Sequence, residues 1–391
     1  MPGITKIRLQ PIVQKNRQPP VTPDQQKHKR TRPLTIILSI LALLALIHFI
    51  AVTHTAYPTL PITNCLELIR NTDYTKFVQL QPETQELGAV QLVDELIDGQ
   101  PAALVPVTDS SSQHRLDVYI YGCSIQKQRP TLTLLFKHQG LIQGTVDVTG
   151  ANTLSIGELD TTLPQDASAQ LQPLQQSVYR EYIWHNGTFV QTVFPGLYPV
   201  ISRSEAEALQ NQANNGQALP WTDPLVTAQQ MAQDILHWSS SDLQVTMQDN
   251  DGTTAHVLLA ELHPRTEVTA TLARLVQHTN TGLWFVTSAQ TRSITLEQTA
   301  LHIPIASPMT IQGTIAQTNG HITAQLFDHT LTPIPILNKA PLSVSENGTY
   351  TGTLLYTNNI PDQPGLLLIK SIPPDGSLAS GQLLLTNVLL G

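Results

Sequence analysis

Charged and aromatic residues are scarce in this chain. Asp, Glu, Lys and Arg make up 13% of its 391 residues and Phe, Trp and Tyr make up 5%, whereas proline occurs 28 times. Long amphipathic helices need a charged face and are interrupted by proline, so this balance favours short strands joined by turns. We therefore expect a mainly β protein.

Cysteine is almost absent, since the chain holds only Cys65 and Cys123, 58 positions apart. In an exported domain one such pair predicts a disulfide, worth roughly 3 to 4 kcal/mol for a loop of this length. Two buried free thiols are the alternative. The residues Ile62-Thr63-Asn64 lack the small apolar side chains expected before a lipid-modified cysteine, so we read no lipoprotein signal.

No Asp, Glu, Lys or Arg occurs between Arg32 and Glu67, and only His48 and His54 can carry a charge there. Within this gap, residues 34–53 read LTIILSILALLALIHFIAVT. Twenty helical residues cover roughly 30 Å, the thickness of the hydrocarbon core of a bilayer. We place a transmembrane helix at residues 34–54; a buried helix of a soluble protein is the alternative.

The basic residues are concentrated before this span. Residues 1–33 hold eight of the 21 Lys and Arg and one of the 29 acidic residues, so the remainder carries 13 basic and 28 acidic side chains. The positive-inside rule predicts that residues 1–33 form a disordered basic cytoplasmic tail and that the C-terminal part lies outside the membrane. A cleaved signal peptide is the alternative. An acidic exterior repels polyphosphate, which argues against nucleic acid as a partner.

The exterior part divides by pattern into three segments. Residues 55–200 read as a β-rich domain, with strands at 102–107, 116–121, 131–136, 141–148, 153–159, 178–184 and 188–194. Residues 201–299 read as an α+β domain, because two helical patterns precede five strand-like segments. Residues 300–391 hold seven short strands, which predicts an immunoglobulin-like β-sandwich.

Two helices are expected in the α+β domain. Ser204-Glu205-Ala206-Glu207 has the spacing of a capping box, and the helix that it opens should stop at residues 214–216, Asn-Asn-Gly. The second helix should begin at Thr222-Asp223-Pro224, with proline in the first turn. Its predicted core face consists of Leu225, Ala228, Met231, Ala232, Ile235 and Leu236.

Several acidic turns superficially resemble calcium loops. Residues 94–99, Asp-Glu-Leu-Ile-Asp-Gly, have the wrong spacing for a full site, and we interpret them as an Asp-Gly turn. Residues 249–252, Asp-Asn-Asp-Gly, would need a ligand at the twelfth loop position, where Ala260 stands. A hairpin turn accounts for them, and we expect no metal site.

The start of the last segment carries a resemblance. Residues 305–313, IASPMTIQG, followed by the alternating AQLFD of residues 324–328, resemble the immunoglobulin-like domain of bacterial spore germination. Residues 283–289, LWFVTSA, match the end of a domain that often lies just upstream in that family. The resemblance covers roughly residues 300–391 and implies an exported adhesion or assembly module without catalytic residues. The charged C-terminal strand of the family is replaced here by LLLTNV at residues 383–388.

Motifs of common enzymes are absent. The sequence has no Gly-rich phosphate loop, no HExxH, no Gly-x-Ser-x-Gly and no paired cysteine metal motif, and we expect no cofactor. A hydrolase whose site lies between the central domains remains the alternative, because catalytic groups can converge from distant positions. Its clustered titratable candidates are Asp94, Glu95, Asp98, Glu181, His185 and Asp223.

The sequence thus predicts a single-pass, membrane-anchored cell-envelope protein, mainly β with an α+β middle. We expect a non-catalytic binding or scaffold role toward an envelope protein or glycan. The resemblance implies a link to sporulation or germination. A sensor that signals through the span is a third reading, although the short cytoplasmic tail leaves little room for an output domain.

Overall fold

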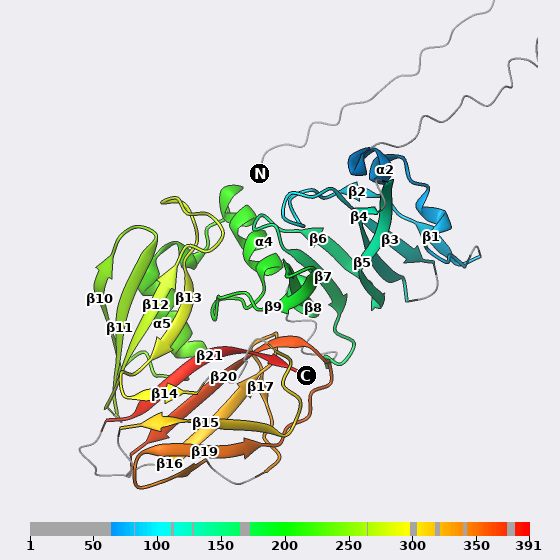
Figure 1. The fold of residues 1–391 in the computed structure, drawn as a ribbon. Helices are drawn as coiled ribbons and strands as arrows, with labels where there is room; N and C mark the ends of the chain where they lie inside the picture. The colour runs from blue at the N-terminus through cyan, green and yellow to red at the C-terminus, as the bar shows by residue number, and fades with distance from the viewer. Residues whose placement is uncertain are drawn as a thin grey trace, which may run out of the picture. The chain divides into compact units, whose positions relative to one another are not determined.

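A computed structural model describes residues 64–81, 83–110, 113–126, 129–164, 173–263, 265–297, 303–316, 321–338, 342–373 and 380–391. All of them belong to one compact unit, Ile62–Gly391. The described residues are mainly β, with antiparallel sheets and three α-helices (Figure 1). The predicted tail at 1–33 and transmembrane helix at 34–54 lie outside these residues, and within them no helix is long and apolar enough to cross a membrane.

Two sheets make up the N-terminal half. Sheet A has the order β1-β3-β4-β5, with β2 also paired to β3, and sheet B has the order β6-β7-β8-β9. The strands of sheet A are β1 (Gln85–Leu87), β2 (Gln91–Leu92), β3 (Ala102–Asp109), β4 (Arg115–Gln126) and β5 (Arg129–Ile142). Those of sheet B are β6 (Thr145–Val148), β7 (Leu154–Leu159), β8 (Ser177–His185) and β9 (Thr188–Thr192).

Sheet A is covered on both faces. Leu104 and Ile120 on one face pack with Leu154 and Ile156 of sheet B, all four fully buried. The opposite face, with Tyr119 and Tyr121, is covered by α2 (Cys65–Asn71) and the 3-10 turn η1 (Tyr74–Lys76). Alternate side chains of residues 116–121 therefore point into two different hydrophobic cores, one on each face of sheet A.

The start of the described chain departs from the prediction. Asn64 caps α2 by accepting a hydrogen bond from the backbone N–H of Glu67 at 2.8 Å. We had not predicted this helix, although Asn followed three residues later by Glu is a typical helix start. At seven residues the helix is too short for apolar periodicity to indicate it.

The strands predicted at 131–136 and 141–148 imply a turn at residues 138–140, and this is wrong, because β5 runs through those residues from Arg129 to Ile142. Gly140 has φ +79°, and its N–H donates to Asp117 Oδ1 at 2.8 Å, where the β4–β5 register shifts. A glycine with positive φ inside a paired strand marks a β-bulge, which produces the same sequence signal as a turn. The chain turns instead at Gln143 and Gly144, which splits the strand predicted at 141–148.

Helix α4 (Arg203–Asn214) begins earlier than predicted. Its N-cap is Ser202, not Ser204: Ser202 Oγ accepts from the Glu205 N–H at 3.3 Å and donates to Glu205 Oε2 at 2.6 Å. Ser202 and Glu205 have the spacing of a capping box, two residues earlier than predicted, although Glu205 accepts from the Ser202 hydroxyl and not from its N–H. The helix ends as predicted at Asn214, and Gly216 has φ +87°.

Helix α5 (Pro224–Asp234) follows the 3-10 turn η3 (Pro220–Thr222) and confirms its prediction. Asp223 caps it, accepting from the Leu225 N–H at 2.8 Å. Five of the six predicted core residues are buried and Leu225 is partly buried. They pack on one face of the strands that follow, where Val257, Leu259 and Val268 are fully buried.

The C-terminal half contains two further sheets. Sheet C has the order β10-β11-β12-β13-β21-β20-β16-β17, and sheet D has the order β14-β15-β19-β18. Sheet C consists of β10 (Leu243–Asn250), β11 (Thr254–Leu262), β12 (Arg265–Ala273), β13 (Phe285–Gln290), β16 (His321–Phe327), β17 (Pro333–Ile334), β20 (Gln363–Ile372) and β21 (Gln382–Leu390). Sheet D consists of β14 (Ile294–Leu296), β15 (Met309–Ile315), β18 (Ser343–Val344) and β19 (Thr349–Leu354).

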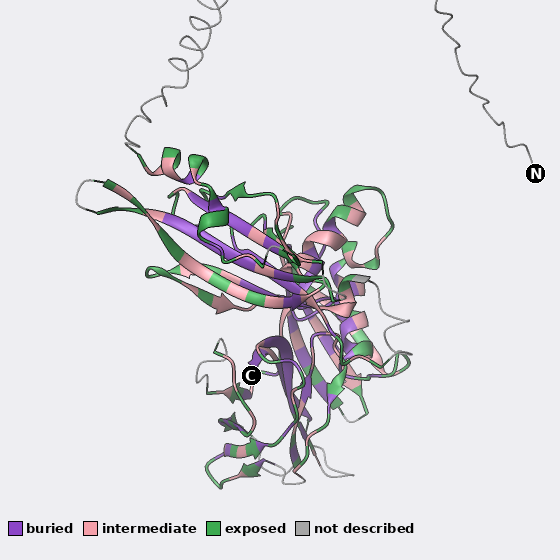
Figure 2. Ribbon diagram, turned by 90° about the vertical axis from the view of Figure 1, so that its right-hand side faces the viewer, coloured by how far each residue is buried: buried purple, intermediate pink, exposed green. Residues whose placement is uncertain are grey.

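Sheet C crosses the domain boundary predicted at residue 299. β13 pairs antiparallel with β21, Ala289 opposite Leu385 and Gln290 opposite Leu384. β20 and β21 are consequently buried along most of their length, as the purple strands beside the C-terminus in Figure 2 show. Sheet D covers the other face, where Ile311 and Tyr350 pack with Leu367 and Val388.

Candidate functional site

The predicted disulfide is present. Cys65 and Cys123 are bonded, which ties the first residue of α2 to β4. Because disulfides persist in oxidising compartments, the bond is consistent with a location outside the cytoplasm. Neither cysteine is free for chemistry.

The six residues proposed for a hydrolase do not form one site. Asp94, Glu95 and Asp98 lie exposed between β2 and β3, where Asp98 and Gly99 have positive φ, as an Asp-Gly turn requires. His185 lies exposed at the end of β8, and its Nε2 is 2.9 Å from Asn186 Nδ2. Asp223 is the cap of α5.

Glu181, the sixth candidate, lies buried on β8 in a structural ion pair. Its Oε1 accepts from Arg203 Nε and from Thr153 Oγ1, both at 2.6 Å. Arg203 also lies over the ring of Phe194, with 5.2 Å from its guanidinium carbon to the ring centroid. The pair joins the first turn of α4 to sheet B, and two further bonds support it: Ser155 with Ser204 at 2.6 Å, and Glu207 with the Gly150 N–H at 3.0 Å.

A second buried pair joins segments distant in sequence. Asp160, just after β7, accepts from His329 Nε2 at 3.0 Å, and the side chains of both are 5% exposed. Burial by itself would raise the pKa of Asp160, but hydrogen bonds from His329 and Thr162 outweigh it and leave the pKa below its ordinary value. His329 lies in the turn between β16 and β17, so the pair fastens sheet B to sheet C.

A cavity of about 710 Å³ lies between α4 and α5. Its floor and walls come from the segment before α4, both helices, η3 and the β16–β17 turn. The lining residues are Leu174, Gln175, Tyr198, Pro199, Val200, Glu205, Leu209, Gln212, Gln217, Leu219, Trp221, Asp234, Ile235, Thr330 and Leu331. We call it the α4–α5 cavity.

Glu205 is the buried titratable group of this cavity. The residue is 7% exposed, and burial raises the pKa of its carboxyl to about 7, even though the Ser202 hydroxyl and the charge of His329 favour ionisation. Ser202 Oγ donates to its Oε2, whereas its Oε1 accepts no hydrogen bond within the described residues. Part of the carboxyl population is therefore protonated at neutral pH.

Asp234, at the end of α5, is the second carboxylate. Its Oδ2 accepts from the Tyr198 hydroxyl at 2.6 Å. Burial first, and this hydrogen bond second, raise the pKa of Tyr198 above its ordinary value. The phenol therefore stays neutral and holds the carboxylate beside the cavity.

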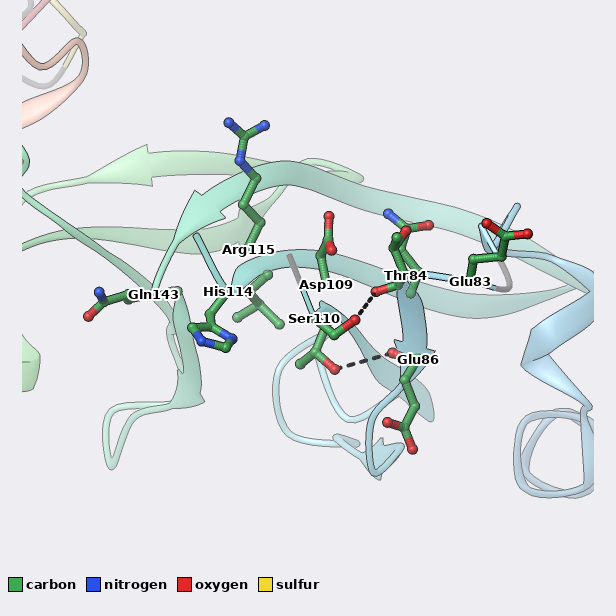
Figure 3. Close-up of a pocket in the computed structure, with 12 residues that line it drawn as sticks. Glu83, Thr84, Glu86, Asp109, Ser110, His114, Arg115 and Gln143 are labelled. Atoms are coloured by element: carbon green, nitrogen blue, oxygen red, sulfur yellow. Dashed lines mark hydrogen bonds between the residues drawn. The ribbon is translucent and has the colours of Figure 1, made fainter. Parts of the chain in front are cut away.

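A second hollow of about 710 Å³ lies at one end of sheet A (Figure 3). Its wall is held by Ser110 Oγ donating to the Thr84 carbonyl at 3.1 Å. The charged side chains of Glu83, Glu86 and Arg115 point in different directions in Figure 3 and do not converge on one point. This hollow lacks the buried polar group that distinguishes the α4–α5 cavity.

No motif in the sequence indicated the α4–α5 cavity. Glu205 appeared as part of a helix cap, and Tyr198, Asp234 and His329 had no motif around them. In the described part of the chain no three His, Cys, Asp or Glu side chains are placed to hold a metal ion. Comparisons with protein-family models, curated proteins and solved structures found no match for the chain.

Proposed function

We propose that this chain is a single-pass, membrane-anchored bacterial cell-envelope protein whose residues 55–391 act outside the membrane as a non-catalytic scaffold. The observation that carries the proposal is the joining of all four sheets into one body. Sheet C runs unbroken from β10 to β17, and buried ion pairs fasten sheet B to α4 and to the β16–β17 turn. Such a body can hold a partner at a fixed distance from its attachment point.

The strand order of the last segment supports an immunoglobulin-like module. β14-β15-β19-β18 and β21-β20-β16-β17 correspond to the orders A-B-E-D and G-F-C-C′ of that sandwich. The disulfide supports an oxidising location. The resemblance of this segment to the spore germination domain leads us to propose an assembly or adhesion role, linked to sporulation or germination.

Chemical cross-linking in intact cells tests the scaffold role. The full chain, carrying an affinity tag at its N-terminus, would be cross-linked, extracted in denaturing detergent and analysed for attached exported proteins and glycans. We expect one defined envelope component in stoichiometric amount. Recovery of the chain alone, under conditions that cross-link a known envelope complex, would contradict the proposal.

A further inference from the structure

We propose that the α4–α5 cavity binds a ligand that carries an ammonium group on an apolar body. The cavity volume of about 710 Å³ lies in the range of roughly 300 to 1,000 Å³ that is usual for small-molecule sites. The inference concerns this cavity alone and does not depend on the scaffold role. It follows from the charge, the polarity and the hydrogen bonding of the lining.

The lining charges select the sign of the ligand. Glu205 and Asp234 line the cavity, and none of its described lining residues is a Lys, Arg or His. His329 is a basic group whose charge acts on Glu205, and its Nε2 is hydrogen-bonded to Asp160. A ligand anion would meet carboxylates without a compensating cation, whereas a ligand cation would be attracted.

Glu205 supplies the anchor. It is more than nine-tenths buried, and its Oε1 accepts no hydrogen bond within the described residues. Among the described residues, Oε1 does not belong to the fully enclosed side-chain oxygens, so it is open to the cavity, where an ammonium N–H can give it a charge-assisted bond. An amine ligand would also stabilise the ionised form of Glu205, which burial disfavours.

One part of the remaining lining suits an apolar body, while Gln212, Gln217 and Thr330 make the rest polar. Tyr198 and Trp221 offer aromatic surfaces, and Leu219, Ile235 and Leu331 offer aliphatic ones. Aromatic faces attract both apolar groups and cations. The arrangement of one anchoring carboxylate and an apolar wall is typical of small-molecule sites.

Three probes that differ only in their head group test the proposal. The full chain in detergent would be titrated calorimetrically with 4-phenylbutylamine, 4-phenylbutanol and 4-phenylbutanoate. We expect saturable one-site binding of the amine, about tenfold weaker binding of the alcohol and no binding of the carboxylate. Equal binding of amine and alcohol, or no amine binding at millimolar concentration, would overturn the proposal.

Two variants locate the binding. Glu205→Gln keeps the shape of the side chain and should weaken amine binding about tenfold, and Asp234→Asn should weaken it by less. Glu346→Gln, at an exposed turn between β18 and β19, is the matched control and should bind like the unmodified chain. An unchanged affinity in the Glu205→Gln protein would refute the site, and amine uptake by detergent alone would appear equally in all variants.

Discussion

The buried carboxyl of Glu205 should make the stability of this protein depend on pH. The folded chain holds the Glu205 proton with a pKa of about 7, against 4.5 for an ordinary glutamate. The protonated carboxyl therefore stabilises the folded state by its full amount below pH 4.5. This contribution to the free energy of unfolding is lost as the pH rises to about 7. At 1.36 kcal/mol for each pH unit, the loss amounts to roughly 3 kcal/mol.

Glu205→Gln removes this titration and keeps a side chain that accepts from Ser202. The difference in unfolding free energy, variant minus unmodified chain, should rise by roughly 3 kcal/mol between pH 4.5 and pH 8. Urea unfolding of the full chain in detergent at several pH values measures it. The Glu346→Gln protein should show no such rise. A difference that stays constant over this range would refute the reasoning.

Four further outcomes are expected. Replacing Cys65 and Cys123 by Ala should lower the free energy of unfolding by about 4 kcal/mol, measured by urea unfolding without reductant. Glu181→Gln should cost about 3 kcal/mol in the same assay, because it leaves the mostly buried guanidinium of Arg203 without its charge partner. Leu385→Ala, at the β13–β21 junction, should cost about 2 to 5 kcal/mol. Protease added to intact spheroplasts should digest the chain after about residue 57, and a protected C-terminus would refute the predicted orientation.

Local signals in the sequence were sufficient for two hairpin turns and for helix α5. Asn186-Gly187 has positive φ at both residues, and Asp251 accepts from the N–H groups of Thr253 and Thr254, as tight turns require. Helix α5 combined a proline start, a capping Asp223 and apolar residues at helical spacing. Each of these features depends on residues within about ten positions of one another.

Contacts between distant segments could not be predicted in this way. Nothing in the alternation of β13 or β21 specifies that they pair, because two buried strands with similar apolar patterns fit many neighbours. Asp160 and His329 stand 169 positions apart, and neither carries a motif. The separate domains at 201–299 and 300–391 were expected because the sequence pattern changes between them. Such a change does not show whether one sheet continues from the first segment into the second.

Helix α4 links the two features from which our proposals follow. Arg203, in its first turn, holds sheet B through Glu181, while Glu205, two residues on, lines the cavity. The two side chains leave the helix about 200° apart around its axis, so one turn of α4 contacts sheet B on one side and the α4–α5 cavity on the other. A ligand bound to Glu205 would therefore contact the element that fixes sheet B. Stabilising that turn would stabilise the junction between the sheets as well as the cavity.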